Sequence, residues 1–345
     1  ALPTPGTPAP PRPAAPVTMP SKRLWLEETL QDDLKWSFSV HKILHTEVSE
    51  FQDVELVETG PFGKVLLLDG KLQSAEADEF VYHECLVQPA MLHHPAPKRV
   101  FIMGGGEGAT AREVLRHKSV ELCVMADIDK VVCDFCEMHL EANQAAFRDK
   151  RFELIIDDAK KSLESYEGTF DVIIGDLADP VYGGPCYQLY TADFYETVVK
   201  KKLAPGGVFV TQSGPAGVLS HKEVYTAINR TLREVFPRVV PYAAHVPSFS
   251  DTWGWNMAFT EAGKEPMSEA EFDKAAKRVT GELSFLDGTA FKGATGLNKA
   301  VRKGLAEEEH VLSVDKPRFI HGSGLGFDGS GFDGDKTDGS KKRKA

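Results

Sequence analysis

Acidic residues follow several short apolar segments in the middle of this sequence. The acids placed directly after such a segment are Glu107, Asp127, Asp129, Asp157, Asp158, Asp176 and Asp179. If the apolar segments are parallel strands, their carboxyl ends meet at one edge of a sheet, where ligands of open α/β sheets bind. Carboxylates gathered at one place must face a cation or share protons. An ordinary Asp-Pro turn is the alternative interpretation of Asp179-Pro180.

The stretch Gly104-Gly105-Gly106-Glu107-Gly108 follows the first of these segments and precedes a helical pattern. Glycine lets a strand turn sharply into a helix and lets a ligand approach the backbone. The third glycine of a dinucleotide fingerprint would fall at Ala109. The spacing of Gly104, Gly106 and Gly108 instead fits the loop that binds S-adenosyl ligands in class I methyltransferase-type folds. A purely structural turn is the alternative.

The next acids have distinct expected roles. Asp127 ends the second segment, about 20 residues after the glycine loop, where a carboxylate accepts hydrogen bonds from ribose hydroxyls. Asp129 is expected to cap the following helix. One acid of the pair after the third segment is placed to meet an adenine amino group, and we favour Asp158, which leaves Asp157 as the expected helix cap.

Short apolar strands alternate with amphipathic helices from residue 98 onward. Strands are expected at 99–103, 121–126, 152–156, 170–175 and 208–212, and helices at 108–117, 129–140, 159–165, 191–202 and 220–235. This alternation predicts right-handed βαβ crossovers and a parallel sheet. Two more strands, 238–246 and 253–260, are expected to add an antiparallel pair, and a further helix lies near 268–279. Residues 47–74 predict a small antiparallel unit, followed by a helix over about 78–92.

Composition narrows the function. The chain has 345 residues and a formal net charge of −11. This balance argues against a nucleic-acid binder, which needs a basic face, and favours a cationic small molecule. No apolar stretch approaches the length of a membrane span. The odd, sparse count of 5 Cys argues against a disulfide scaffold, so we expect a cytoplasmic protein, with a plastid or nuclear location left open.

The motifs occur in the order seen in the polyamine aminopropyltransferases, and the chain resembles this spermidine and spermine synthase family over residues 24–322. The residues that carry the resemblance are Leu67-Leu68-Asp69-Gly70, Gln73, Asp78-Glu79-Phe80, Tyr82-His83-Glu84, the glycine loop, Asp127-Ile128-Asp129, Asp158-Ala159 and Asp176 with Asp179-Pro180. The match is closer to the thermospermine synthase branch. That branch is matched by Gly175 to Pro180, Gly183 to Tyr190, Thr211 to Gly217, His245 to Trp255 and Arg318 to Gly322.

The resemblance implies an α/β fold, with a Rossmann-like, class I methyltransferase-type sheet after a small N-terminal antiparallel β domain. It implies the β domain over 24–76 and the catalytic domain with a C-terminal extension over 77–321. The two ends lie outside the resemblance, and their composition predicts a disordered Pro/Ala-rich leader over 1–23 and a disordered Gly/Asp/Lys-rich tail over 322–345. The basic end of that tail could alternatively be an import signal or an anion-binding patch. The resemblance also implies a homodimer or homotetramer.

The family's reaction takes an aminopropyl group from decarboxylated S-adenosylmethionine, passes it to an amine and releases methylthioadenosine. In the thermospermine branch the amine is spermidine. A protonated amine has no lone pair, so a base must take a proton. The leaving group is a neutral thioether, so neither a metal nor a prosthetic cofactor is expected.

Site roles follow from the same resemblance. Asp176 is expected to be the base, and Tyr82 and Asp179 to orient the attacking amine. The expected donor residues are Gln52, Gln73, Gly104, Gly106, Glu107, Gly108, Asp127, Asp158 and Ala159. Glu107 would hold the ammonium of the donor's aminopropyl group. The expected acceptor residues are His83, Gln212, Phe249 and Trp253, although sheet packing is the alternative for the aromatic residues.

Some residues depart from the usual spermidine synthase pattern. Glu107 stands where that pattern has Asp, His83 where it usually has Gln, and Leu177-Ala178 where it has Ser-Ser. These departures agree with the thermospermine branch. The alternatives are a spermidine or spermine synthase, a methyltransferase that uses S-adenosylmethionine, and an inactive scaffold of the same fold. The pair Cys133 and Cys136 is expected in the core, and Cys186 is not expected to be a nucleophile.

Overall fold

The structure is a computed structural model that describes residues 24–31, 33–181 and 184–320. The predicted leader over 1–23 and the predicted tail over 322–345 lie outside the described residues.

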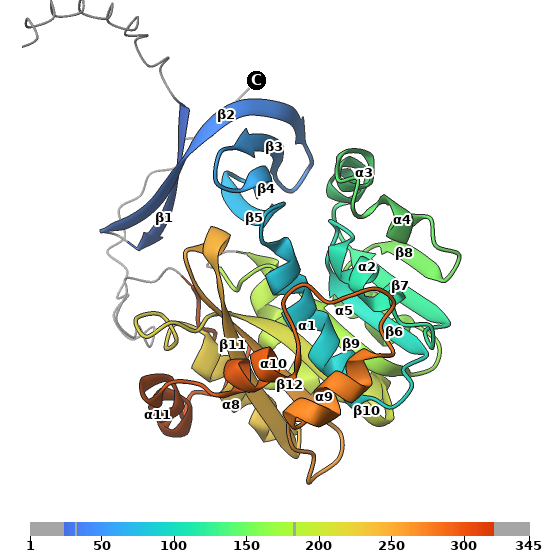
Figure 1. The fold of residues 1–345 in the computed structure, drawn as a ribbon. Coiled ribbons are helices and arrows are strands. Elements are labelled where there is room, and N and C mark those ends of the chain that lie inside the picture. The colour runs from blue at the N-terminus through green and yellow to red at the C-terminus, as the bar shows by residue number, and fades with distance from the viewer. Residues whose placement is uncertain (1–23, 32, 182–183, 321–345) are drawn as a thin grey trace, which may run out of the picture.

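The N-terminal part is a five-stranded antiparallel sheet, drawn in blue in Figure 1. Its strands follow one another in chain order: β1 (Leu24–Gln31), β2 (Leu34–Val48), β3 (Asp53–Thr59), β4 (Gly63–Leu68) and β5 (Lys71–Ala75). Side chains alternate between its faces. Phe38, Val57 and Val65 form an apolar cluster, while Val54 and Leu66 belong to another that includes side chains of helix α3 (Lys130–His139). The N-terminal sheet therefore packs against helix α3 of the second part through an apolar cluster.

The second part is a seven-stranded sheet with strand order β11-β12-β10-β9-β6-β7-β8. The strands are β6 (Arg99–Gly104), β7 (Leu122–Asp127), β8 (Phe152–Ile156), β9 (Phe170–Asp176), β10 (Leu203–Pro215), β11 (Arg238–Val246) and β12 (Asp251–Phe259). Strands β10, β9, β6, β7 and β8 are parallel, and β12 and β11 add an antiparallel pair at the β10 edge. The predicted α/β fold class, its parallel sheet and its antiparallel pair are confirmed.

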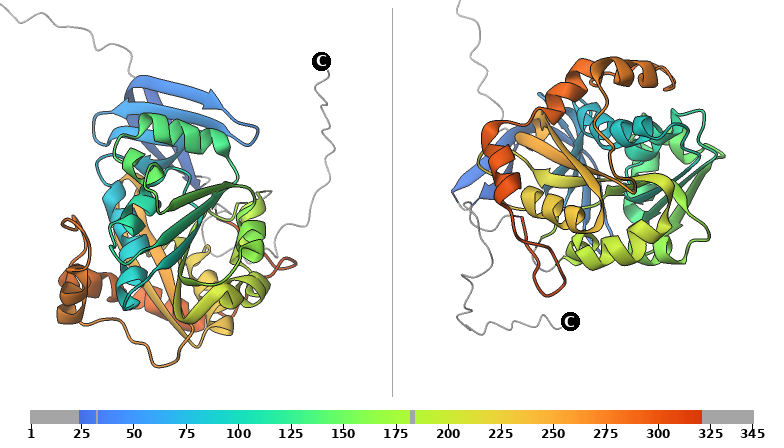
Figure 2. Two further views of the ribbon diagram at one scale, coloured as in Figure 1. Left: turned by 90° about the vertical axis from the view of Figure 1, so that its right-hand side faces the viewer. Right: turned by 90° about the horizontal axis from the view of Figure 1, so that it is seen from below.

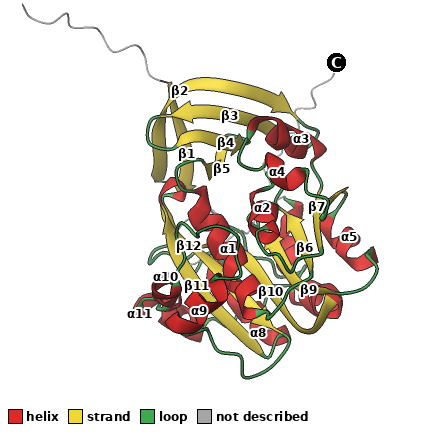
Figure 3. Ribbon diagram, turned by 45° about the vertical axis from the view of Figure 1, so that its right-hand side comes forward, coloured by secondary structure: helices red, strands yellow, loops and turns green. Residues whose placement is uncertain are grey.

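Helices cover both faces of this sheet (Figures 2 and 3). Their bounds are α1 (Glu79–His93), α2 (Ala109–Leu115), α3, α4 (Gln144–Phe147), α5 (Ala159–Ser165), α6 (Ala192–Phe194), α7 (Lys200–Lys202), α8 (Tyr225–Val235), α9 (Glu269–Ala276), α10 (Gly288–Thr295) and α11 (Lys299–Glu307). A π-helical segment, Tyr195–Val199, joins α6 to α7, and 3₁₀ segments lie at Pro185–Tyr190 and Pro247–Phe249. Strand β6 shows the two faces clearly, since Val100 and Ile102 belong to one buried cluster and Phe101 and Met103 to the other.

Several local predictions were wrong. The helix expected from residue 220 begins at Tyr225, because residues 217–223 form turns in which His221 Nδ1 bonds the Gly217 carbonyl at 2.9 Å. The helix expected over 191–202 is interrupted by the π-helical segment. The β domain was expected over 24–76, but strands β1 and β2 were not predicted individually, because most of their side chains are exposed or half-buried. Helices α10 and α11 were also missed.

Candidate active site

The carboxyl ends of the parallel strands bring the glycine loop next to Asp176. Strand β6 ends at Gly104, which pairs with Asp176 at the end of β9. Gly104 has a φ of +77°, and a Cβ placed there would lie 2.2 Å from the Asp176 carbonyl oxygen. A larger residue would push the two strand ends apart, so the glycine is needed for this close approach.

Asp127, the last residue of β7, is fixed against the same loop. The Gly106 amide donates to Asp127 Oδ2 at 3.0 Å, and the Asp129 amide donates to Oδ1 at 2.9 Å. Burial raises the pKa of Asp127, and these two amides lower it part of the way back. A Cβ at Gly106 would lie 2.8 Å from Asp127 Oδ2. The carboxylate is thereby oriented before any ligand binds.

Asp129 caps helix α3, as the sequence predicted. Its Oδ1 accepts hydrogen bonds from the amides of Val131 and Val132 at 3.0 and 3.2 Å. Its Oδ2 accepts from Ser49 Oγ at 2.6 Å and from Gln52 Nε2 at 3.0 Å. Gln52, expected on the donor side, thus reaches across from the N-terminal part to the strand-end edge of the second sheet.

The cap of helix α5 corrects one expectation. Asp158, and not Asp157, is the N-cap, and its Oδ1 accepts from the Lys161 amide at 2.8 Å. Asp157 instead pairs with Lys161 Nζ at 2.6 Å. A carboxylate has several lone pairs, so capping leaves Asp158 able to accept a further bond. Ala159 follows as the first residue of the helix and is buried.

Asp176 receives hydrogen bonds from two hydroxyl groups. Tyr82 Oη donates to Oδ1 at 2.8 Å, and Thr110 Oγ1 donates to Oδ2 at 2.6 Å. Tyr82 lies in the first turns of α1, and Thr110 in the first turn of α2. Burial, and then the charge of Asp176, raises the pKa of Tyr82 well above its usual value, so the phenol stays a donor. The sequence had not indicated Thr110, although its place at the start of the helix after the glycine loop was a usable signal.

Gln212 is buried and joins several predicted acceptor residues. Its Nε2 lies 3.0 Å from Asp179 Oδ1, 2.9 Å from Tyr190 Oη and 2.8 Å from the Leu177 carbonyl oxygen. Its Oε1 accepts from Trp253 Nε1 at 3.2 Å. The amide hydrogens of Gln212 are therefore used within the protein, and Gln212 orients Asp179 and Trp253.

His83 lies between two carboxylates. Its Nδ1 is 2.7 Å from Glu79 Oε2, and its Nε2 is 3.2 Å from Glu107 Oε1. Both ring nitrogens are thus engaged inside the protein, although the sequence had placed His83 on the acceptor side. Among the residues the structure describes, these three form a cluster with metal-ligating side chains. The two carboxylates contact opposite ring nitrogens, so both are ion-pair partners of the His83 ring when it is protonated.

A cavity of about 530 Å³ lies between the two sheets and reaches the loops that follow β10 and precede β12. Of the predicted site residues, its lining includes Gln52, Gln73, Asp179, Phe249 and Trp253. Phe249 and Trp253 pack edge to face, with ring centroids 4.8 Å apart, and Phe249 also contacts the Tyr82 ring at 5.6 Å. The aromatic wall is therefore continuous with Tyr82, which bonds Asp176.

The cavity is rich in acids. The carboxylates among the lining residues are Glu28, Asp69, Asp179, Glu223 and Asp251, and Lys71 is also in the lining. Burial raises the pKa of Asp179 to about 6; Gln212 and Lys71 lower it, while the charges of Glu223 and Glu28 raise it. Such a cavity concentrates cations. The sequence had not indicated Glu28, because β1 was expected only as part of the β domain over 24–76 and not as an individual strand.

The cysteines behave as expected. Cys133 and Cys136 are buried in apolar clusters. Burial raises the pKa of Cys186 to about 11, helped by the charges of Asp127, Asp179 and Asp158, so its thiol is protonated at neutral pH. This argues against a nucleophilic Cys186.

Comparisons with known proteins agree with this geometry. Residues 79–271 match the Spermine/spermidine synthase domain, and residues 24–76 match the Spermidine synthase tetramerisation domain. The chain is 54% identical over 311 residues to Thermospermine synthase ACAULIS5 from Arabidopsis thaliana, which covers 88% of this chain and 89% of that protein. It is 41% identical over 302 residues to a polyamine aminopropyltransferase from Aeropyrum pernix, covering 86% of this chain and 95% of that protein.

Solved structures show the same architecture. A crystal structure of spermidine synthase in complex with the transition-state analogue AdoDATO matches with a TM-score of 0.75 and 28% identity, covering 84% of this chain and 97% of that chain. Spermidine synthase from Thermotoga maritima matches with a TM-score of 0.74 and 27% identity, over the same shares of the two chains.

The fold and the site define a polyamine aminopropyltransferase. The chain belongs to the spermine/spermidine synthase family. In the part of the chain that the structure describes, no helix is long and apolar enough to cross a membrane.

Proposed function

We propose that this protein is a thermospermine synthase, which transfers the aminopropyl group of decarboxylated S-adenosylmethionine to spermidine and releases methylthioadenosine. One observation carries the proposal: Asp176 is held by Tyr82 and Thr110 beside the glycine loop, and the Tyr82 ring contacts Phe249, which lines the acidic cavity. The 54% identity to Thermospermine synthase ACAULIS5 supports this choice of acceptor.

The donor is proposed to lie along the strand ends. Asp127 accepts bonds from the ribose hydroxyls, and Asp158, beside Ala159, accepts from the adenine amino group. Gly104, Gly106 and Gly108 let the nucleoside approach the backbone, while Gln52 and Gln73 complete the donor side. Glu107 takes the ammonium of the aminopropyl group, which places the carbon next to the sulfonium near Asp176.

The reaction is a displacement at that carbon. The acceptor amine loses a proton to Asp176, its nitrogen forms a bond to the propyl carbon, and the carbon–sulfur bond breaks. Its electron pair stays on sulfur, so methylthioadenosine leaves as a neutral thioether, and the proton passes from Asp176 to solvent. Tyr82 and Asp179 align the amine, and alignment of this kind is worth up to roughly 7–11 kcal/mol in favourable cases.

The acceptor is proposed to lie in the cavity. Its carboxylates suit the ammonium groups of a triamine, and the rings of Phe249 and Trp253 suit its methylenes and cations. Gln212 acts on the acceptor through Asp179 and Trp253, since its own amide is bonded within the protein.

Product analysis tests the proposal. Purified protein is incubated with decarboxylated S-adenosylmethionine and either putrescine or spermidine, and the products are separated by a method that resolves thermospermine from spermine. Thermospermine formed from spermidine supports the proposal. Spermidine formed from putrescine, or spermine formed from spermidine, would keep the chemistry and overturn the acceptor.

Thermal-shift measurements distinguish an aminopropyltransferase from the alternative, a methyltransferase that uses S-adenosylmethionine. Stabilisation by methylthioadenosine together with a polyamine supports aminopropyl transfer, whereas a response to S-adenosylmethionine alone supports methylation.

The match of residues 24–76 to a tetramerisation domain leads us to propose a homodimer or homotetramer. Sedimentation that shows a monomer would contradict this.

A further inference from the structure

Glu107 is held from more than one direction. His83 Nε2 lies 3.2 Å from Glu107 Oε1, and Ser74 Oγ lies 3.3 Å from the same oxygen. The Glu107 carbonyl oxygen accepts a hydrogen bond from Asn143 Nδ2 at 2.8 Å. Both side-chain contacts fall on one carboxylate oxygen, so the orientation of the other oxygen, Oε2, is set by the protein.

These contacts belong to a closed ring of side chains. His83 Nδ1 lies 2.7 Å from Glu79 Oε2, which also accepts from Arg112 Nη2 at 2.8 Å. Arg112 Nη1 donates to Asn143 Oδ1 at 2.6 Å, and Asn143 returns to Glu107. Helices α1 and α2 supply most of the ring. Closed networks of this kind restrict each member more than an isolated bond does.

His83 is a cation in this arrangement. Only 3% of its surface is exposed, and burial alone would lower its pKa, but the charge of Glu107 and the contact with Glu79 outweigh burial and raise the pKa to about 9. His83 and Arg112 both contact Glu79, and His83 also contacts Glu107, so the cations of the ring are paired with its carboxylates.

We propose that His83 is a positioning residue for the donor, whose imidazolium holds Oε1 of Glu107 so that Oε2 meets the donor's ammonium. This inference rests on the proposed role of Glu107. It assigns to His83 a part in donor binding, while the nucleoside contacts of Asp127 and Asp158 do not depend on it. Glu79 acts through His83, because it bonds the opposite ring nitrogen.

Comparison of two ligands tests this role. Methylthioadenosine has the nucleoside and thioether of the donor but lacks the aminopropyl ammonium, so it does not need Glu107. Binding of methylthioadenosine and of decarboxylated S-adenosylmethionine is measured by titration calorimetry at pH 7.5 on the intact protein. His83→Gln is expected to weaken binding of the donor about tenfold or more, the size of one charged hydrogen bond, and to leave methylthioadenosine within about twofold.

His117→Gln is the matched control. His117 is also a buried histidine, 1% exposed, and it bonds Gln88 at 2.9 Å; within the described part of the chain it hydrogen-bonds no member of the ring around Glu107 directly and reaches Arg112 only through Gln88 and Glu113. The control is expected to leave the ratio of the two affinities unchanged. A double-mutant cycle with Glu79→Gln adds a second measure, because the double variant should bind donor no more weakly than His83→Gln alone.

The outcomes separate this inference from the proposed function. If Glu107→Gln leaves the preference for donor over methylthioadenosine intact, the proposed role of Glu107 fails. If Glu107→Gln abolishes that preference and His83→Gln does not, the role of His83 is overturned while the proposed function stands. Equal weakening of both ligands by His83→Gln would show a merely structural histidine and would also overturn the inference.

Discussion

Asp176 is the residue on which the proposed chemistry depends most directly. Its oxygens accept from Tyr82 and Thr110 at 2.8 and 2.6 Å, so its orientation is fixed before substrates bind. Asp176→Asn keeps the size of the side chain but removes the base. We expect it to lower kcat by roughly two to four orders of magnitude and to leave methylthioadenosine affinity unchanged.

Thr110→Val tests the same carboxylate with a smaller expected effect than Asp176→Asn. It removes one hydrogen bond to Asp176 and keeps the shape of the side chain, so we expect a loss of about tenfold in kcat. Steady-state rates and calorimetry of both variants provide the measurement. Near-native turnover of Asp176→Asn would remove Asp176 from the role of base.

The charge of Glu107 predicts a pH dependence of donor binding. Burial raises the pKa of Glu107 to about 7, although the charge of His83 lowers it. The carboxylate is ionised above that pH and protonated below it, so affinity for the donor's ammonium should fall as the pH drops below 7, approaching about tenfold per pH unit. Methylthioadenosine affinity should stay constant, and a parallel fall for both ligands would point to another group.

Sequence reasoning located the strand-end acids, because residue type, loop length and sheet topology together fix that edge. It could not tell which neighbour caps a helix, so Asp157 and Asp158 were exchanged in that role. It also could not show that His83 reaches Glu107 and not the cavity, because side-chain contacts between distant segments leave no trace in spacing. The functional roles proposed for the strand-end acids and for His83 stay predictions.

At the scale of elements, helix α1 connects the two sheets and anchors a distant segment. Glu84, which is 1% exposed, accepts hydrogen bonds from the amides of Ser284, Phe285 and Leu286 at 2.6–2.9 Å. Burial raises the pKa of Glu84, and these amides lower it in part. The segment leads into α10, whose Phe291 joins the main apolar cluster.

Glu84→Ala leaves those three amides without their acceptor, and the amide of Leu286 belongs to a buried residue. We expect it to lower the free energy of unfolding by about 3 kcal/mol or more, measured by urea denaturation. Glu121→Ala is the control, because Glu121 forms an exposed ion pair with Lys98 at 2.8 Å, which is worth less than about 1 kcal/mol. Equal losses for the two variants would contradict an anchoring role for Glu84.

Elements with strong apolar periodicity were predicted well, and those without it were missed. Strands β6, β7 and β9 of the second sheet are buried on both faces, which gives continuous apolar runs. Strands β1 and β2 have largely exposed side chains, and α10 contains glycines at 288 and 293, which lower helix propensity. Their structure comes from tertiary packing, which the local sequence does not display.

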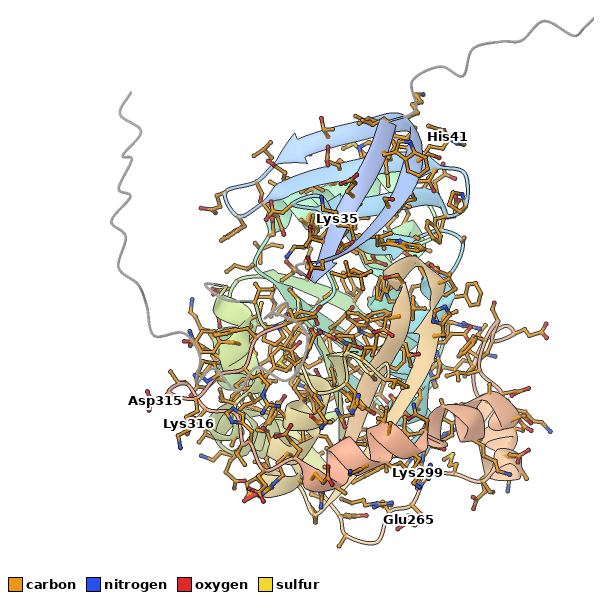
Figure 4. The ribbon with its side chains drawn as sticks, turned by 90° about the vertical axis from the view of Figure 1, so that its left-hand side faces the viewer. Lys35, His41, Glu265, Lys299, Asp315 and Lys316 are labelled. Atoms are coloured by element: carbon orange, nitrogen blue, oxygen red, sulfur yellow. The ribbon has the colours of Figure 1, made fainter. Side chains whose placement is uncertain are left out.

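At the scale of the whole molecule, the two sheets build the cavity together. Glu28 of β1 faces residues from the loops around β10 and β12 across it, although these segments are far apart in the chain. Lys35 lies on the outside of the N-terminal sheet, and Lys299 near the opposite end of the molecule (Figure 4). Neither the existence of this cavity nor the presence of Glu28 in it follows from any local motif.

Neighbouring glutamates on β1 test whether the N-terminal sheet takes part in acceptor binding. Glu28 lines the cavity, and burial raises its pKa against the opposing effects of the Leu72 amide and Lys71. Glu27, one residue earlier, pairs on the surface with Lys35 at 2.9 Å. Because successive side chains of a strand point to opposite faces, Glu28→Gln should raise the spermidine KM roughly three- to tenfold, whereas Glu27→Gln should not change it. Donor KM should be unaffected in both variants. An unchanged spermidine KM in Glu28→Gln would mean that the acceptor is held by the second part of the chain alone.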